Sequence, residues 1–430
     1  MIKDNYDLIV VGGGTSGVSC AWNAAVLGLK VLLIEKTSCL GGAITNMLVV
    51  PAMQISKNSI NNDFYNKLYN ELYEINGAIT YSDGNKGWFN PELTKVIMDK
   101  MLIENGVDIL FESEVVNIRH NNGNILSVDI GTIYDDKNSL FFNNTLLANI
   151  ETKYLVDATG NGKICEDLNC EIIKNSNTDY QPTSLRFILS GINLEKFEKW
   201  LIEFDKDRTV TTSYKLGDAI HLSTAYTWDT GKEWALKPLF KDAVENSVLE
   251  VEDTNYFQIF TIAGMHNSIA FNAPRIVKSK LTRTEQYIYA RSAILRLANF
   301  CKIYLPGFEK SYISNIANTL GVRVTKRYKG KYIYTYQDLI EGRKFENPVI
   351  IADYPVDIHS ENKDKSKLEK VRKEYQLPIE ALMVKNFENL FVIGKCISAE
   401  FEAQAALRII PSCFSMGEGL AKYIKHLQSC

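Results

Sequence analysis

Residues 6–36 contain the feature that most constrains the fold of this chain. The stretch reads YDLIVVGGGTSGVSCAWNAAVLGLKVLLIEK. Residues 6–11 have the length and apolarity of a buried parallel strand. A small-residue helix is expected over 16–28, and a second apolar run ends at Glu35. The order strand, glycine-rich turn, helix, strand predicts a β–α–β unit and therefore an α/β fold with a parallel sheet.

A glycine pattern lies in the turn of this unit. Gly12, Gly14 and Gly17 give the spacing G-x-G-x-x-G. The first glycine permits the tight turn, the second lets the backbone reach a pyrophosphate, and the third lets helix and strand pack closely. The helix start favours an anion, and Glu35 is placed to accept hydrogen bonds from ribose hydroxyls. The complete unit predicts a dinucleotide site, with Thr15, Ser16 and Lys36 as adjoining candidates.

Three later stretches extend this expectation. The pair Gly41-Gly42 permits backbone to lie against a flat ligand. The run TKYLVDATGNG is a strand that leads into Ala158-Thr159-Gly160, and ENLFVIGK is a strand that ends at Gly394. A helix is expected to begin around Ser412–Gly419. Regions spread from residue 6 to residue 424 are thus expected to build one nucleotide-binding domain.

The middle of the chain has a different character. Residues 166–375 contain no second G-x-G-x-x-G and mix strand-like runs with helical ones. We expect a Rossmann-like domain from residues 1–165 and 376–430, with a parallel sheet and a β-meander that turns at Asn121-Asn122-Gly123. Residues 166–375 are expected to form an inserted α+β substrate or cap domain.

Composition excludes several classes of protein. Lys plus Arg number 48 against 51 Asp plus Glu, a net charge of −3, which does not indicate nucleic acid or a membrane surface as a partner. No apolar run approaches the ~20 residues of a membrane span. The eight cysteines are scattered without a CxxC, which argues against an iron–sulfur centre, a zinc ribbon and a dithiol redox pair. A reduced, cytoplasmic protein is expected.

Taken together, these motifs resemble the FAD-dependent oxidoreductases of the glutathione-reductase-like superfamily, and most of all a subgroup related to fumarate reductases. The resemblance implies FAD, with its pyrophosphate on the glycine-rich turn, its adenosine ribose on Glu35 and its flavin ring at the start of the C-terminal helix. The chain differs from many relatives at Lys395, where they carry an acid that holds the ribityl chain. The implied cofactor-binding residues are Gly12, Gly14, Thr15, Ser16, Gly17, Glu35, Lys36, Gly41, Gly42, Val115, Ala158, Thr159, Gly160, Gly394 and Gly417.

The resemblance also bears on the reaction. A nicotinamide dehydrogenase would not need three distant stretches to hold its cofactor, whereas the longer, embedded FAD does. The lack of a second dinucleotide motif argues against a built-in NAD(P)H domain, so electrons would enter or leave through substrate, oxygen, a quinone or a carrier protein. We expect hydride transfer between a small polar, anionic organic molecule and flavin N5. The alternatives are a non-catalytic FAD-binding electron carrier or sensor, and a nucleic-acid-modifying flavoprotein.

Two arginines are the first catalytic candidates. Arg408 lies in an apolar stretch, where a guanidinium is costly unless it is paired. Its partner is either a substrate carboxylate, as the similarity to fumarate reductases implies, or Glu400 or Glu402. In LGVRVTKRYKG, strand alternation places Arg323 on one face with Thr325 and Arg327. That face is either a solvated edge or a wet cleft.

The remaining candidates are weaker. His359 is placed by resemblance and is otherwise a structural histidine; His266 has still less support. Cys413 is either redox-active beside the flavin or a small buried hydrophobe. The C-terminal helix start is expected to stabilise negative charge on the reduced flavin. Gly417 and Gly419 either permit that close approach or serve helix packing only.

Overall fold

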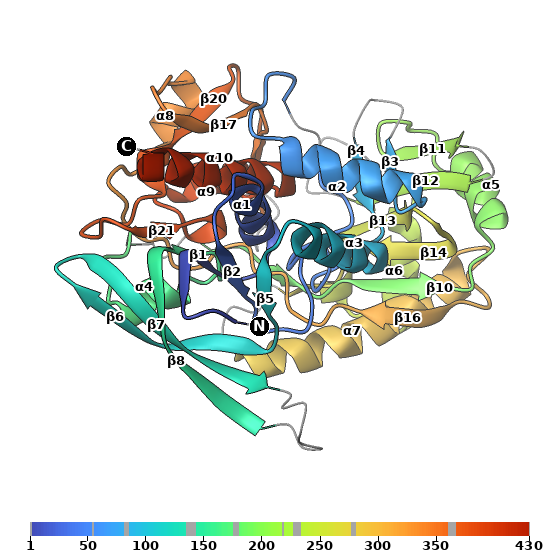
Figure 1. The fold of residues 1–430 in the computed structure, drawn as a ribbon. Helices are drawn as coiled ribbons and strands as arrows, with labels where there is room; N and C mark the ends of the chain where they lie inside the picture. Colours follow the sequence, from blue (N-terminus) through green and yellow to red (C-terminus); the bar gives the residue numbers. More distant parts are fainter. Residues whose placement is uncertain are drawn as a thin grey trace.

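The computed structural model describes residues 2–53, 56–80, 86–134, 143–174, 180–216, 219–226, 234–276, 281–359 and 367–429. Two large sheets organise these residues, one with seven strands and one with six. In Figure 1 the seven-stranded sheet occupies the lower left and the six-stranded sheet the right. Within the described ranges, no helix has both the length and the apolarity that a bilayer crossing requires.

The seven-stranded sheet combines a parallel part with an antiparallel meander. Its order is β5-β2-β1-β8-β7-β6, and β21 pairs with the free side of the β8 end. The pairs β1–β2, β2–β5, β1–β8 and β8–β21 are parallel, and β6–β7–β8 are antiparallel. Because the parallel strands come from both ends of the chain, the expected Rossmann-like sheet with a meander is confirmed. The strands are β1 (Asn5–Val11), β2 (Val31–Ile34), β5 (Asp108–Leu110), β6 (Ser113–Asn121), β7 (Asn124–Tyr134), β8 (Asn143–Asp157) and β21 (Leu390–Val392).

Strand β1 is buried on both faces, as its continuous apolar run requires. Leu8 and Val10 belong to one hydrophobic core, and Ile9 and Val11 belong to a second core on the other face of the sheet. The meander turns where the sequence indicates, because Asn122 and Gly123 both take positive φ values, 48° and 79°. Such a pair is the requirement of the tight hairpin turn that matches strand twist.

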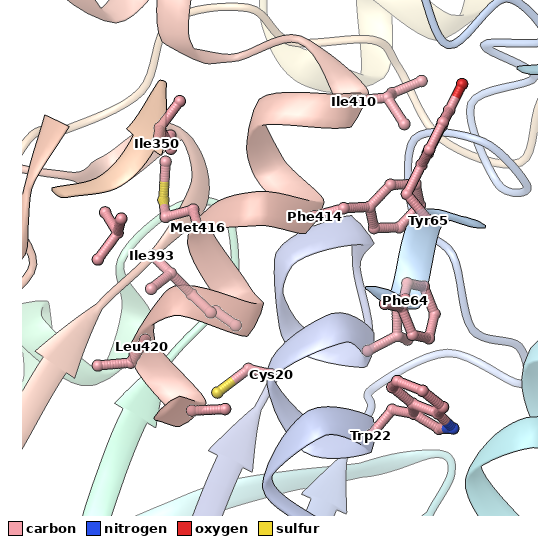
Figure 2. Close-up of a cluster of buried hydrophobic side chains, with 14 of the residues drawn as sticks. Cys20, Trp22, Phe64, Tyr65, Ile350, Ile393, Ile410, Phe414, Met416 and Leu420 are labelled. Atoms are coloured by element: carbon pink, nitrogen blue, oxygen red, sulfur yellow. The ribbon is translucent and has the colours of Figure 1, made fainter. Parts of the chain in front are cut away.

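Helices α1 (Thr15–Val26) and α10 (Ile410–Ser429) pack closely beside the sheet. Figure 2 shows Phe414 of α10 beside Phe64 and Tyr65, with Met416 and Leu420 further along the same helix. The ring centroids of Phe64 and Phe414 are 5.1 Å apart. A side chain at Gly417 would place its Cβ 2.2 Å from the carbonyl oxygen of Ser16, so the two helices meet in contact that only glycine permits.

The C-terminal helix begins two residues earlier than expected. It starts at Ile410, and a separate short helix, α9 (Phe401–Leu407), replaces the connecting segment that the sequence suggested. The other helices that flank the first sheet are α2 (Asp63–Glu74), α3 (Pro91–Glu104), α4 (Lys163–Asp167) and α8 (Tyr336–Glu341).

The six-stranded sheet is wholly antiparallel and has its own core. Its order is β11-β12-β13-β14-β10-β16, and Phe187, Phe257 and Phe271 lie at the centre of the apolar cluster that it buries. This is the α+β unit expected within the insertion. Its elements are β10 (Phe187–Ser190), α5 (Leu194–Phe204), β11 (Thr211–Leu216), β12 (Ala219–Tyr226), α6 (Lys237–Glu245), β13 (Phe257–Ile262), β14 (Met265–Phe271), α7 (Arg283–Tyr304) and β16 (Tyr312–Ile316).

Four two-stranded sheets join these bodies. Val349, Ile350, Tyr375 and Leu377 of the β17–β20 pair belong to the core that also holds β1 and α10. The end of the range assigned to the insertion therefore packs with the first sheet, and the boundary at residue 375 stays a prediction. The pairs are β3 (Ala78–Thr80) with β4 (Lys86–Phe89), β9 (Thr183–Ser184) with β15 (Arg275–Ile276), β17 (Pro348–Ala352) with β20 (Tyr375–Pro378), and β18 (Val356–Ile358) with β19 (Lys367–Glu369).

Candidate functional site

The glycine-rich turn lies where strands from distant parts of the chain end together. The end of β1 pairs with the end of β8, and the end of β8 pairs with the end of β21. Gly12 has a φ of 109°, and a Cβ there would lie 2.4 Å from the carbonyl oxygen of Ala158. At Gly17 a Cβ would lie 1.9 Å from the carbonyl oxygen of Gly12. Both glycines are therefore required by close backbone packing at this edge.

Gly14 differs from these two glycines because the space beside it is open. No atom lies within 4 Å of the position that its Cβ would take. It caps α1, whose first turn has no acidic residue and no side-chain cap. The hydroxyl of Ser16 is buried and has no hydrogen-bonded N or O partner in the described part of the chain. Open space, free helix N–H groups and a buried hydroxyl beside the Cys413 thiol together fit a pyrophosphate.

The glycine pair after β2 lies against the same turn. Gly41 forms a bridge with Gly14, and the Gly41 amide donates to the carbonyl of Gly13 at 2.8 Å. A Cβ at Gly42, which has a φ of 51°, would lie 3.0 Å from the Gly14 Cα. The structure thus brings Gly41 and Gly42 to the edge where the dinucleotide is expected.

Glu35 reaches the turn from the end of β2. Its Oε2 accepts the amide of Gly13 at 2.7 Å, and its Oε1 accepts the amide and the hydroxyl of Thr37 at 2.8 Å and 2.7 Å. These bonds fix the carboxylate, and Oε2, which accepts one bond, retains a lone pair for a ribose hydroxyl. Lys36 is exposed beside it, and Val115 is buried in β6 in the core behind the sheet.

The β8 end is held by Asp157. Its Oδ1 accepts the amide and hydroxyl of Thr159, and its Oδ2 accepts the amide of Cys165 at 3.0 Å. The Thr159 hydroxyl also accepts the amides of Gly162 and Lys163. These bonds build the turn that presents Ala158 and Gly160 next to Gly12. Burial raises the pKa of Asp157, and the hydrogen bonds from Cys165 and Thr159 oppose that shift.

Gly394, with a φ of 84°, completes the set, because its Cβ position lies 3.5 Å from the Ser16 hydroxyl. Lys395 follows and turns toward Gly160, whose Cβ position lies 3.5 Å from the Lys395 Cε. The ammonium donates to the carbonyl of Val322 at 2.8 Å, and burial lowers its pKa. We call the residues 12–17, 41–42 and 158–160 with Gly394 the cofactor cradle.

The start of α10 adjoins the cofactor cradle, but its glycines pack elsewhere. Gly417 faces α1, and a Cβ at Gly419 would lie 2.8 Å from Val349 Cβ. The geometry therefore supports the packing alternative for both glycines. Cys413 is buried, and burial raises the pKa of its thiol while the hydroxyls of Ser16 and Thr15 lower it. Its place beside the start of α1 agrees with a small buried side chain.

The segment that contains Arg323 differs from its expectation. Residues 322–327 are not paired as a strand, and isolated bridges hold only Gly321 and Tyr328 on either side. Arg323 is 9% exposed and Arg327 is 2% exposed, so neither lies on a solvated edge. Nη1 of Arg323 donates to the carbonyl of Pro182 at 2.6 Å. The solvated-edge alternative for these arginines is wrong.

Arg408 has a partner that neither sequence alternative named. It is the C-cap of α9, and its Nη2 donates to the Asp357 carbonyl at 2.9 Å and to Gln181 Oε1 at 3.2 Å. The same nitrogen lies 3.5 Å from Asp357 Oδ2. Glu400 instead accepts the amide of Tyr336, so the proposed pairing of Arg408 with Glu400 or Glu402 is wrong. The Arg408 Nε has no hydrogen-bond partner among the described residues.

His359 lies on the other side of Asp357. Its Nε2 is 3.3 Å from Asp357 Oδ1. Burial opposes ionisation of Asp357, but the contact with His359 and the charges of Arg408 and Arg323 outweigh it and lower the pKa of the carboxyl. Burial, together with the charge of Arg275, holds the pKa of His359 well below its usual value. The pair is therefore a carboxylate with a neutral imidazole. His266 is exposed on β14, outside this group.

Two more arginines join this group, and the sequence analysis missed them. Arg275 is 6% exposed in β15, and its guanidinium carbon lies 3.6 Å from the ring centroid of Tyr256. Arg186 lies just before β10, and burial followed by the charge of Arg275 lowers its pKa to about 10. Burial is also the main cause that lowers the pKa of Arg323, followed by the charges of Arg275, Arg408 and Arg186.

We call these four residues, Arg186, Arg275, Arg323 and Arg408, with Asp357 and His359, the arginine cluster. The signal for Arg186 was available in SLRFILSGI, where a charge interrupts an apolar run just as Arg408 does. In the described part of the chain, Asp357 is the carboxylate that forms an ion pair with this cluster. Four guanidinium groups therefore face one carboxylate.

Gln404 of α9 connects the arginine cluster to the cofactor cradle. Its Nε2 donates to the carbonyls of Arg323 and Lys395, both at 3.3 Å. Lys395 in turn donates to Val322, the neighbour of Arg323. The strand ends that would hold a long dinucleotide thus adjoin a buried, cationic group of side chains.

Comparison with known proteins assigns the cofactor. Residues 7–426 match the family model described as FAD dependent oxidoreductase. The chain belongs to this family. The cofactor of this family is FAD, and membership of the family confirms the resemblance in the sequence. When bound, FAD supplies the redox centre, and the cofactor cradle is the part of the chain with the space and donors to hold its pyrophosphate and ribose.

Curated relatives match only segments of this chain. A ferredoxin–NADP reductase of Mycoplasmoides gallisepticum is 40% identical over 83 residues, which are 18% of this chain and 25% of that protein. Dihydrolipoyl dehydrogenase 2 of Arabidopsis thaliana is 28% identical over 167 residues, 37% of this chain and 29% of the relative. The chain therefore spans less than a third of the length of either relative.

Solved structures match nearly the whole length of this chain, at low identity and low TM-score. A p-nitrophenol 4-monooxygenase from Pseudomonas putida covers 99% of this chain with 81% of its own, at a TM-score of 0.48 and 8% identity. A geranylgeranyl bacteriochlorophyll reductase-like protein from Thermoplasma acidophilum covers 99% with 79% of its own, at a TM-score of 0.47 and 13% identity. Values this low do not indicate what this chain acts on.

Proposed function

We propose that this enzyme transfers a hydride between a small anionic organic substrate and N5 of its FAD. The arginine cluster carries this proposal. Buried charges are stable only when they are paired and hydrogen-bonded, yet four guanidinium groups share the Asp357 carboxylate among the residues that the structure describes. An anionic substrate would supply the missing charge, next to the strand ends that hold the cofactor.

Arg408 and Arg323 are the proposed anchors of the substrate anion. The Nε of Arg408 is buried and has no hydrogen-bond partner among the described residues. Asp357 and Gln181 hold the Nη2 of the same guanidinium. A guanidinium held on one side presents its remaining N–H groups in a defined direction, which favours a carboxylate over a neutral group. Orienting the substrate against the flavin is the contribution that such contacts make to hydride transfer.

We propose that His359 supports this geometry and does not itself bind the substrate anion. Burial and Arg275 lower its pKa, so the imidazole is neutral at pH 7. A neutral imidazole stabilises the Asp357 carboxylate by a hydrogen bond without adding a further positive charge to the arginine cluster. Arg408 then faces a carboxylate whose own geometry is fixed.

The electron partner is proposed to be separate from this chain. The sequence carries one G-x-G-x-x-G, so oxygen, a quinone or a carrier protein would take or supply the electrons. NAD(P)H should reduce the flavin only slowly. Rapid, stoichiometric bleaching of the flavin by NADH without oxygen would contradict this part of the proposal. A cytoplasmic location and the absence of a nucleic-acid partner also remain proposals, supported by the composition.

The purified protein tests the whole proposal. We expect a yellow protein with one FAD per chain whose absorbance near 450 nm bleaches anaerobically with an organic acid and not with the matching amide. A protein that no small molecule reduces without a partner protein would instead be an electron carrier or sensor. The variant Arg323→Gln should lose the bleaching while keeping its FAD. Arg291→Gln, at an exposed position on α7, is the matched control.

A further inference from the structure

The four arginines approach one another from two sides of the molecule. Arg186 precedes β10 of the six-stranded sheet, and Arg275 lies in β15, which pairs with β9. Arg323 and Arg408 belong to the segments that Gln404 ties to Lys395 beside the cofactor cradle. One pair therefore belongs to the inserted unit and the other to the cofactor side.

Arg275 differs from the other three arginines in how its donors are used, since Arg186 also donates to a carbonyl, that of Leu48, at 3.4 Å. Arg323 and Arg408 donate to the carbonyls of Pro182 and Asp357, at 2.6 Å and 2.9 Å. The Nε and Nη2 of Arg275 are buried without a hydrogen-bond partner in the described residues. These two atoms lie on one edge of a guanidinium, the edge that binds a carboxylate or phosphate with two parallel bonds. Arg275 thus offers a complete oxyanion-binding edge that nothing in the described chain occupies.

Tyr256 holds this edge in place. The guanidinium carbon of Arg275 lies 3.6 Å from the centroid of the Tyr256 ring, and Tyr256 is itself 7% exposed. Stacking on an aromatic face fixes the plane of a guanidinium and leaves its N–H groups at the rim. The hydroxyl of Tyr256 is tied to Gln258 Oε1 at 3.0 Å, so the ring is oriented as well. A buried, preoriented donor edge is a property of a binding site.

The charge balance favours more than one anionic group in the site. Among the described residues, four guanidinium groups face the Asp357 carboxylate and a neutral His359, so a substrate with one negative charge leaves two positive charges without a partner and a dianion leaves one. We propose that the substrate is a dianion and that Arg275, stacked on Tyr256 and flanked by Arg186, binds its second negative charge. This inference rests on the proposed function, since it assigns the substrate class of the same site.

Two kinds of small molecule are dianions of this type: those with two carboxylates and those with one phosphate group. A Kd series on the FAD-loaded protein at pH 7.5 separates them, read from perturbation of the flavin spectrum and from calorimetry. The probes are malonate, succinate and glutarate, inorganic phosphate, and butyrate as the matched monoanion of succinate. We expect at least one dianion to bind about tenfold or more tightly than butyrate, a difference of about 1.4 kcal/mol. The dianion with the lowest Kd shows whether the site prefers two carboxylates or one phosphate group.

Arg275→Gln is the informative variant. It should remove the tenfold preference for the dianion and leave the Kd of butyrate within about twofold of the wild-type value, because a monoanion uses Arg408 and Arg323. Arg275→Lys should keep part of the preference through its charge but not through bidentate geometry. The exposed Arg291→Gln is the control and should change neither Kd. If Arg275→Gln loses FAD, Arg186→Gln serves the same comparison.

Equal binding of butyrate and every dianion to the wild-type protein would overturn the inference. So would a parallel loss of both affinities in the folded, FAD-loaded Arg275→Gln protein. Both results leave the proposed function intact as long as butyrate binds and Arg323→Gln abolishes that binding. If neither monoanion nor dianion binds to the yellow protein, the proposed function itself fails.

Discussion

The cofactor cradle presents backbone groups and open space at the edge of a sheet, whereas the arginine cluster places charged side chains in the interior. In the cofactor cradle, a Cβ at Gly12 or Gly17 would lie only 2.4 Å or 1.9 Å from a backbone carbonyl oxygen, whereas the space beside Gly14 is open. In the arginine cluster, each contact is made by a long side chain, such as that of Arg408 to Asp357. The first region depends on the absence of side chains and the second on their charge.

This difference has a physical consequence for how each region fails. A change in the cofactor cradle alters steric fit, and the effect of a steric clash does not depend on pH. A change in the arginine cluster alters a balance of charges, in which burial and pairing oppose each other. Substitutions, pH and conservative changes of charge therefore separate the two regions.

The largest expected effect contrasts two glycines three residues apart. Gly17→Ala places a Cβ 1.9 Å from the Gly12 carbonyl and should destabilise the fold by about 3 kcal/mol or more, because backbone cannot move aside cheaply. The Cβ of Gly14→Asn meets no described atom within 4 Å and asparagine is a good helix cap, so the apoprotein should melt normally. Its FAD affinity should nevertheless fall by about 100-fold or more, about 2.8 kcal/mol.

Circular dichroism melting of the apoproteins and FAD titration check both halves of this contrast. If Gly14→Asn retains FAD, the open space beside Gly14 is not the pyrophosphate site. If it melts early, Gly14 is required for the fold in the same way as Gly17.

Next in size is Arg408→Lys. Lysine keeps the charge but cannot reproduce bidentate geometry to a carboxylate, so turnover per flavin should fall by about 2–4 kcal/mol in transition-state stabilisation. FAD content and melting temperature should barely change. If Arg408 serves only to hold Asp357, the same variant should melt earlier and lose flavin while each bound flavin turns over normally. FAD occupancy and turnover measured on one sample decide between the two roles.

The pH dependence of stability is expected to come from two buried histidines, His359 of the arginine cluster and His221 of β12. Burial holds the pKa of His359 well below its usual value, and burial with the charge of His266 lowers that of His221 to about 4. Between these folded values and about 6.5 the unfolded chain binds more protons, so stability falls as pH drops, by at most about 1.4 kcal/mol per pH unit for each histidine.

Urea unfolding at pH 7, 6 and 5 measures this slope. His359→Gln and His221→Gln should each flatten it, and the double variant should flatten it further. His120→Gln, at an exposed position on β6, should leave the slope unchanged. A wild-type protein equally stable at pH 7 and pH 5 would contradict a buried neutral His359.

The smallest expected effect is at Lys395, which lies between the two regions. Its ammonium uses one bond, to the Val322 carbonyl, and has two N–H groups left near Gly160. Lys395→Gln should weaken FAD binding by about fivefold, about 1 kcal/mol, through loss of a charge near the cofactor. Lys241→Gln, on the exposed surface of α6, is the control for charge alone. An unchanged FAD affinity would mean that Lys395 is only a structural donor.

The cofactor side of the molecule was largely predictable from the sequence. The β–α–β unit, its glycines and the later strand ends at Ala158 and Gly394 were assigned before the fold was known, and the parallel pairing of β1, β8 and β21 confirms that they meet. This was possible because backbone requirements leave a local signature. A tight turn, a close helix contact and an apolar strand each restrict consecutive residues.

The arginine cluster was decided by tertiary structure. The sequence placed Arg323 on a strand that does not form, and it offered Glu400 or Glu402 to Arg408 where the fold supplies Asp357. The positions of Arg186 and Arg275 in the sequence show no spacing that connects them to Arg323 or Arg408. Electrostatic partners are chosen by distance and burial in space, and neither quantity is written in the separation of residues along the chain. The sequence by itself determined that this protein holds a dinucleotide, and only the packing of distant segments determined which charges surround the place beside it.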